Sequence, residues 1–110
     1  MTTQIPFQAA VYLDAVDRGD IEGSLAALAP DAVVLDDGKT YRGDQIRAWR
    51  SSSESEYTYT REFLGLLPID ETHSVARYRL EGDFPGGVVE LRFLFTTRAD
   101  GLIERLEITP

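Results

Sequence analysis

The sequence has 110 residues, of which 43% are hydrophobic and 27% are charged, as in one ordinary globular domain. Its 19 acidic and 11 basic residues give a net charge of −8, which argues against nucleic acid or an anionic membrane as a partner. The absence of cysteine excludes disulfides and thiolate metal sites, and a single histidine argues against other metal sites. No apolar run is long enough to span a membrane, and the first residues lack a signal-peptide pattern. We therefore expect a single cytoplasmic domain over residues 1–110, without a metal or another cofactor.

The first third of the sequence has the spacing of amphipathic helices. Apolar residues recur at helical intervals over 7–16, and Gly19 is a typical left-handed C-cap. Asp20 can cap a second helix, which we expect over about 21–28, before a proline. The two helices are predicted to pack as a hairpin.

A strand, a turn and a third helix follow. The apolar, β-branched run 32–35 predicts a strand, and residues 36–39 form a turn because Gly38 readily adopts a positive φ. After a short return strand we expect a third helix from about residue 44 to the serines at 51–53. Trp49 is predicted to face inward on this helix.

From residue 57 onward the pattern is that of β-strands. Four runs alternate apolar and polar residues: 57–67, 74–80, 88–98 and 102–109. The loops between them are short, which indicates antiparallel neighbours. The sequence therefore predicts an α+β fold in which a curved antiparallel sheet wraps around the N-terminal helices. The concave side of such a sheet would enclose a cavity.

Two residues are candidates for catalysis. Asp36 closes the first strand, and a carboxylate at a cavity wall can act as a general base. By composition alone a solvated turn acid is favoured, and the composition does not separate Asp36 from Asp37. Tyr12 lies near the inward stripe of the first helix, where its hydroxyl could donate to an oxyanion or simply belong to the core.

Aromatic residues on the third helix and the strands form a second candidate group. They could hold an apolar ring substrate, or they could form an ordinary core that needs no ligand. The expected substrate-binding residues are Trp49, Tyr59, Tyr78, Phe93 and Phe95.

Charged residues alternate with these aromatics and are assigned to the opposite face of the sheet. Arg77, Arg79, Glu90 and Arg92 are expected to form cross-strand ion pairs. Leu94 shares this face, which indicates either a homodimer through the sheet or a solvated surface with scattered apolar residues.

Several runs resemble the nuclear-transport-factor-two-like superfamily, and its SnoaL-like and ketosteroid-isomerase-like members in particular. They are YLDAVDRGD (12–20), LAAL (25–28), DAVVLD (31–36), YRG (41–43) and IRAW (46–49). The resemblance extends over essentially the whole chain. It implies a cone-shaped, cystatin-like α+β roll that is often dimeric through its sheet.

The resemblance also implies roles for individual residues. The oxyanion-donating tyrosine of the isomerases falls on Tyr12 and their general base on Asp36. Their second, acidic donor falls near Phe93, which cannot donate, and the tyrosines that support the donor are replaced by Leu28 and Arg50.

Three functions are therefore open. The protein is a cofactor-independent enzyme of the isomerase or cyclase type acting on an apolar ring substrate, a non-catalytic pocket for a small apolar molecule, or a dimeric interaction domain. This fold hosts all three, so the fold alone does not choose between them.

Overall fold

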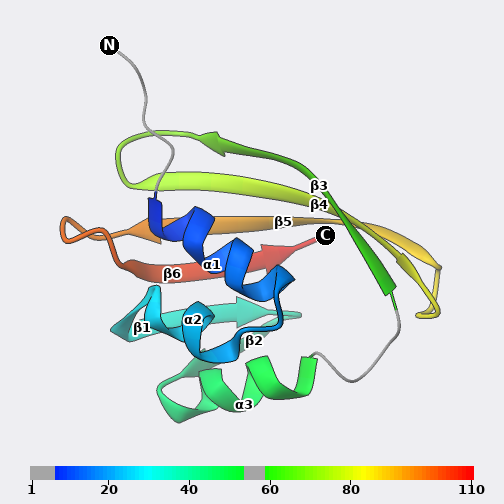
Figure 1. Cartoon of the computed structure of the whole chain (residues 1–110), viewed down its shortest axis with the longest axis horizontal. Helices are drawn as coiled ribbons and strands as arrows, with labels where there is room; N and C mark the ends of the chain where they lie inside the picture. The colour runs from blue at the N-terminus through cyan, green and yellow to red at the C-terminus, as the bar shows by residue number, and fades with distance from the viewer. Residues whose placement is uncertain (1–6, 54–58) are drawn as a thin grey trace.

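The computed structural model describes residues 7–53 and 59–110. In this part of the chain three helices and six strands follow one another (Figure 1). They are α1 (Phe7–Asp17), α2 (Ile21–Ala26), β1 (Leu28–Asp36), β2 (Lys39–Arg42), α3 (Asp44–Ser53), β3 (Tyr59–Pro68), β4 (His73–Gly82), β5 (Val88–Thr97) and β6 (Ile103–Thr109). The start of the third strand was expected at residue 57, and residues 57 and 58 lie outside the described part.

The described strands form one sheet in the order β2-β1-β6-β5-β4-β3. All neighbours are antiparallel except β1 and β6, which are parallel, with Val34 opposite Leu106 and Asp36 opposite Ile108. The predicted α+β fold with a curved sheet is confirmed, but its purely antiparallel pairing is wrong at this one pair. Short loops set the direction of consecutive strands only, and β1 and β6 are far apart in the chain.

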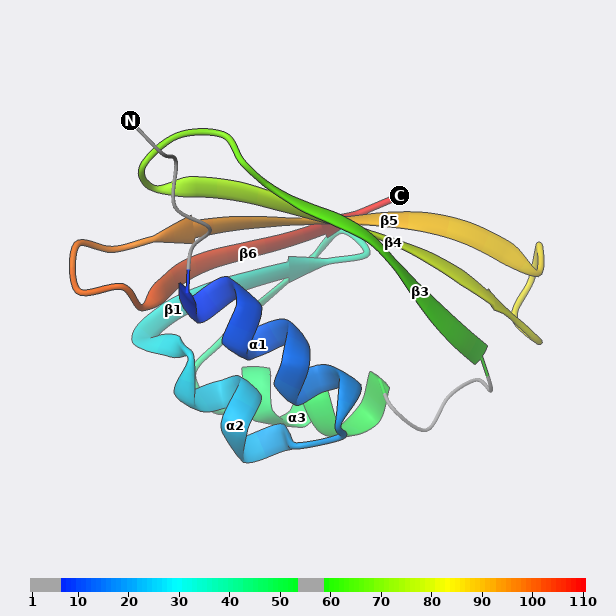
Figure 2. The same cartoon turned by 45° about the horizontal axis from the view of Figure 1, so that its top comes forward.

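All three helices lie on the same side of the sheet, and the beginning of β3 bends toward that side (Figure 2). The core lies between the helices and the inner face of the sheet, and its buried residues are mainly Ala9, Tyr12, Leu13, Val34, Ile46, Trp49, Ala76, Tyr78, Phe93, Phe95, Ile103, Leu106 and Ile108. Within the described ranges no helix is long and apolar enough to cross a membrane.

The first two helices are joined by a short capped connection. Gly19 has a φ of +70° and ends α1, and the Asp20 carboxylate accepts a hydrogen bond of 2.9 Å from the backbone N–H of Gly23. Helix α2 ends at Ala26, two residues before the predicted end at Leu28. The reason is tertiary, because Leu28 already pairs with Ile103 of β6.

The turn between β1 and β2 confirms the prediction for residues 36–39. Asp37 and Gly38 have φ values of +54° and +74°, and Asp36 pairs with Lys39. Two successive positive φ values define the hairpin turn that suits the twist of the flanking strands. This turn fixes the position of Asp36 at the end of β1.

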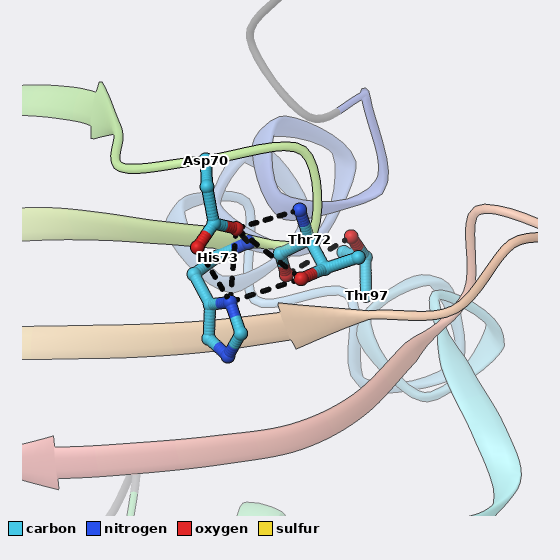
Figure 3. Close-up of polar contacts among 4 residues, drawn as sticks. All are labelled: Asp70, Thr72, His73 and Thr97. Atoms are coloured by element: carbon cyan, nitrogen blue, oxygen red, sulfur yellow. Dashed lines mark hydrogen bonds and ion pairs between the residues drawn. The ribbon is translucent and has the colours of Figure 1, made fainter.

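Hydrogen bonds to Asp70 organise the turn between β3 and β4 (Figure 3). Its Oδ1 accepts from the backbone N–H groups of Thr72, at 2.9 Å, and His73, at 2.8 Å, and lies 2.9 Å from the His73 Nδ1. These bonds, of which that from Thr72 has the largest effect, lower the pKa of Asp70 to about 2. The backbone N–H of Thr97 donates to the carbonyl of Thr72 and ties the turn to the end of β5. His73 is exposed, as expected for a surface histidine.

The outer face of the sheet carries the predicted charges. Arg77 on β4 and Glu90 on β5 form an ion pair of 2.6 Å, which confirms one cross-strand pair. Arg79 pairs with Glu81, two residues along its own strand, at 3.1 Å, and across strands with Glu62 of β3 at 3.9 Å. The pairs are about half exposed, so each contributes little to stability.

Candidate functional site

The concave side of the sheet holds a cavity of about 120 Å³, called the inner cavity below. It is lined by Tyr12, Val16, Asp36, Trp49, Arg50, Tyr59, Arg61, Leu80, Leu91, Phe93 and Ile108. These residues come from helices α1 and α3 and from five strands, so the cavity requires the complete fold. Five of the side chains carry groups capable of acid–base or ionic chemistry, namely Tyr12, Asp36, Arg50, Tyr59 and Arg61.

Asp36 faces this cavity because of the alternation along β1. It shares the inner face of the strand with Ala32 and Val34, both buried, whereas Asp37 follows in the turn and is exposed. The Asp36 Oδ2 accepts a hydrogen bond of 2.9 Å from the Trp49 Nε1. Of the two acids left open by the sequence, Asp36 is therefore the one that lines the inner cavity.

Trp49 holds the carboxylate of Asp36 in place. The indole is 8% exposed and stacks on the ring of Tyr41 from β2, with the ring centroids 5.9 Å apart. A side chain packed in this way has few rotamers available, so the direction of its N–H is fixed. The hydrogen bond consequently orients the carboxylate toward the cavity wall shared by α3 and β1.

Tyr12 is almost completely buried on α1, with its ring edge against Phe95 at a centroid distance of 5.8 Å. Burial raises the pKa of its hydroxyl well above the usual range, and the charges of Arg50 and Arg61 oppose this rise while that of Asp36 adds to it. The hydroxyl is therefore protonated at neutral pH and able to donate a hydrogen bond. Its electrostatic coupling to Asp36 agrees with both residues lining one cavity.

The predicted aromatic set divides into two groups. Trp49, Tyr59 and Phe93 line the inner cavity, whereas Tyr78 and Phe95 do not. Tyr78 is 2% exposed and packs between Phe63 and Phe93, with a centroid distance of 5.4 Å to each. Phe95 lies behind Tyr12. These two rings support the cavity wall from behind.

The sequence analysis did not predict that two arginines line the site, although the resemblance puts Arg50 at the position of a supporting tyrosine. Arg50 on α3 is 3% exposed, and its Nε donates to the Ser24 hydroxyl at 3.1 Å. Arg61 on β3 donates through Nη1 to Asp17 at 2.8 Å, and its guanidinium carbon lies 4.3 Å from the ring centre of Tyr78. The available signal was the alternation in β3, which puts Arg61 on the same face as Tyr59.

A wider groove of about 400 Å³, the outer groove, adjoins the inner cavity. The two share Asp36, Tyr59, Leu80, Leu91 and Ile108, and the groove adds Asp37, Phe84, Val89 and Pro110. Apart from the two aspartates its wall is mainly apolar. The site therefore has a polar inner end and an apolar outer end.

The described residues contain no group of three or more histidine, cysteine, aspartate or glutamate side chains placed to hold a metal ion. The polar groups that line the inner cavity are a carboxylate, two phenols, an indole N–H and two guanidinium groups.

The fold and the lined cavity define the class as a cone-shaped α+β roll with a pocket on its concave side. No protein-family model matches the chain, and no curated protein matches it. A crystal structure of a candidate polyketide cyclase from Sinorhizobium meliloti is similar over 94% of both chains, with 34% identity and a TM-score of 0.85. The chain therefore belongs to the SnoaL-like family of the nuclear-transport-factor-two-like superfamily, which confirms the resemblance seen in the sequence.

More distant structures share the fold. RV0760c from Mycobacterium tuberculosis, solved in complex with estradiol-17beta-hemisuccinate, is 21% identical over 97% of this chain and 95% of its own, with a TM-score of 0.78. The Delta 5-3-ketosteroid isomerase from Mycobacterium sp. is 24% identical over 96% of this chain and 92% of its own, with a TM-score of 0.75.

Proposed function

We propose that this protein catalyses a cofactor-independent proton transfer at a carbon next to a carbonyl group, in a small ketone that carries an apolar ring. The observation that carries the proposal is that Asp36 from β1 and Tyr12 from α1 line the same cavity. A carboxylate and a phenol at one site are the general base and the oxyanion donor that enolisation requires.

In the proposed step, Asp36 removes a proton from the carbon, and the electrons of the broken C–H bond form an enolate. The Tyr12 hydroxyl donates a hydrogen bond to the enolate oxygen without losing its proton. Asp36 then returns the proton to another carbon of the same molecule, which gives an isomer. In the cyclase version, the enolate carbon attacks a second carbonyl carbon of the substrate, and the oxygen of that carbonyl takes the proton from Asp36. Neither version consumes an oxidant or a reductant.

The surroundings of the two residues support this assignment. The Trp49 N–H orients the Asp36 carboxylate, and orientation of the base is a large part of the rate of a proton transfer. Tyr59, Leu91 and Phe93 offer an apolar wall to a ring. The S. meliloti relative, at 34% identity, is named as a candidate polyketide cyclase, which agrees with the cyclase version of the step.

Hydrogen–deuterium exchange next to the carbonyl tests the proposal directly. Cyclohexanone and indanone in deuterated buffer are followed by proton NMR with the wild type, Asp36→Asn and Tyr12→Phe. We expect Asp36→Asn to slow the catalysed exchange by about 10²–10⁴-fold and Tyr12→Phe by roughly 10²-fold. Asp37→Asn removes the same charge from the adjacent turn position, and its effect should be far smaller.

Two results decide against the proposal. Equal exchange rates in the wild type and Asp36→Asn would remove Asp36 as the base. Saturable binding of the ketones without any catalysed exchange would favour the non-catalytic pocket. A computationally designed 17-OHP binder shares this fold, with a TM-score of 0.77.

We further propose a cytoplasmic homodimer that associates through the outer face of the sheet. Leu94, half-buried among charged residues of that face, is the side chain on which this proposal rests. Sedimentation velocity over a range of concentrations tests the dimer, and a monomer at every concentration would refute it.

A further inference from the structure

The inner cavity contains an unusual cationic group. One of the two terminal nitrogens of Arg61, Nη2, is buried and has no hydrogen-bond partner among the described residues, whereas Nη1 is paired with Asp17. A buried donor of this kind costs free energy, and native proteins retain few of them. Arg61 is one of the residues that line the inner cavity, but Nη2 itself is closed to water, so an acceptor in the cavity would reach it only after a turn of the guanidinium.

The position of Arg61 is fixed by its neighbours. The guanidinium lies over the face of the Tyr78 ring, which attracts the cation but offers no in-plane acceptor to its N–H groups. Asp17 holds the other nitrogen from the rim, where the aspartate is about half exposed. Nη1 is thus anchored to Asp17, whereas the buried Nη2 has no partner among the described residues.

Two further groups make the inner end of the cavity suitable for an anion. The side chain of Arg50 is buried in the same wall and carries a second positive charge. The Tyr12 hydroxyl, a protonated donor, experiences the charge of both arginines. Asp36 is the acidic residue of the cavity lining, and its carboxylate accepts a hydrogen bond from the Trp49 Nε1.

The volumes of the two parts of the site limit the size of the anionic group that a ligand could place in the inner cavity. The inner cavity, at about 120 Å³, is smaller than the roughly 300–1,000 Å³ of sites that enclose a whole drug-sized ligand. The adjoining outer groove, at about 400 Å³, is mainly apolar. A molecule with a small acidic head and an apolar ring would therefore place its head inside and its ring outside.

We propose that the site binds a ring-bearing oxo acid, with the carboxylate of the ligand accepting from the Arg61 Nη2 and the charge of Arg50 supporting it. The part of this proposal that concerns the keto group rests on the proposed function, in which Tyr12 and Asp36 contact that group. The new part is that the carboxylate of the substrate determines specificity. A guanidinium suits this task because its planar N–H groups match carboxylate oxygens.

Binding is tested with an unreactive pair of probes, phenylacetate and its neutral methyl ester, by isothermal titration calorimetry. We expect phenylacetate to bind at least about tenfold more tightly than the ester in the wild type. Arg61→Met is expected to abolish this preference. The matched control is Arg77→Met, which removes an arginine from the outer face of the sheet and should keep the preference. Equal affinities in the wild type, a preference that survives in Arg61→Met, or no saturable binding of phenylacetate at millimolar concentration would overturn the proposal.

Circular dichroism establishes whether Arg61→Met folds. Should it not fold, Arg61→Lys takes its place. Lysine keeps the positive charge but has a single nitrogen, which cannot replace both the Nη1 contact with Asp17 and the Nη2 contact with a ligand. The preference for phenylacetate over the ester is then expected to fall by at least about fivefold, because the charged hydrogen bond to the carboxylate is weakened. An unchanged preference in Arg61→Lys would contradict the role of Nη2.

A second pair of probes separates this proposal from the proposed function. Phenylpyruvate and its methyl ester both carry exchangeable hydrogens next to a ketone, and only the first carries a carboxylate. Arg61-dependent binding of phenylacetate without exchange of phenylpyruvate would retain the carboxylate site and refute the enzyme. Catalysed exchange that is equally fast for phenylpyruvate and its ester, in the wild type and Arg61→Met, would retain the enzyme and refute the carboxylate site.

Discussion

The hydrogen bond from Trp49 to Asp36 is a strong test of the site geometry, because it can be removed from either end. Trp49→Phe keeps an aromatic ring against Tyr41 and removes the N–H, and Asp36→Ala removes the acceptor. A buried hydrogen bond to a charged group contributes about 1.5–3 kcal/mol. Since this one is only partly buried, we expect about 1–2 kcal/mol, or roughly a five- to thirtyfold change in the folded-to-unfolded ratio.

A double-mutant cycle isolates this contribution from the loss of ring area. The wild type, both single variants and the double variant are unfolded in urea and followed by far-UV circular dichroism. Fluorescence is unsuitable because Trp49 is the only tryptophan. We expect Trp49→Phe to destabilise the wild type by about 1–2 kcal/mol more than it destabilises Asp36→Ala. A difference below about 0.5 kcal/mol, within the error of additivity, would refute the hydrogen bond as the group that positions Asp36.

Three further predictions concern the scaffold. The pKa of Asp70 is lowered to about 2 from its ordinary value of 3.8, so its hydrogen bonds stabilise the fold above about pH 4 and are lost as the pH falls toward 2. In thermal unfolding, Asp70→Asn should therefore lose less stability than the wild type between pH 4 and pH 2. Parallel pH profiles of the two proteins would contradict this. Gly38→Ala should cost about 1–2 kcal/mol in urea unfolding, because alanine is strained at a φ of +74°. Leu106→Ala, at a fully buried position, should lower the free energy of unfolding by about 2–5 kcal/mol in the same assay. A loss below about 1 kcal/mol would mean that neighbouring side chains move into the space left by the leucine.

Most of the fold could be predicted because its determinants are local. The alternation in β4 and β5, the cap at Asp20 and the turn at Gly38 each depend on residues within a few positions of one another. The pairing of β1 with β6 could not be predicted in this way, because no turn connects the two strands and the apolar pattern fits either direction. The same pairing ended α2 early.

The site was predicted in part for a similar reason. The end of the first strand indicated Asp36 or Asp37, only the resemblance to the isomerases favoured Asp36, and the helical stripe indicated Tyr12. Arg50 and Arg61 were not identified because arginine is rarely buried without a partner, so composition assigns it to the surface. Their burial depends on Ser24, Asp17 and Tyr78, which come from other elements.

The central position of β6 has a consequence for how the protein is made. Until β6 leaves the ribosome, the β1–β2 hairpin and the β3–β5 meander are two sheets without a common strand, since β6 lies between β1 and β5. Each partial sheet would expose an unpaired edge, which is the feature that leads to aggregation of nascent chains. Ile108, on β6, also completes the wall of the inner cavity. The wall of the inner cavity is therefore complete only after β6 has emerged and paired with both partial sheets.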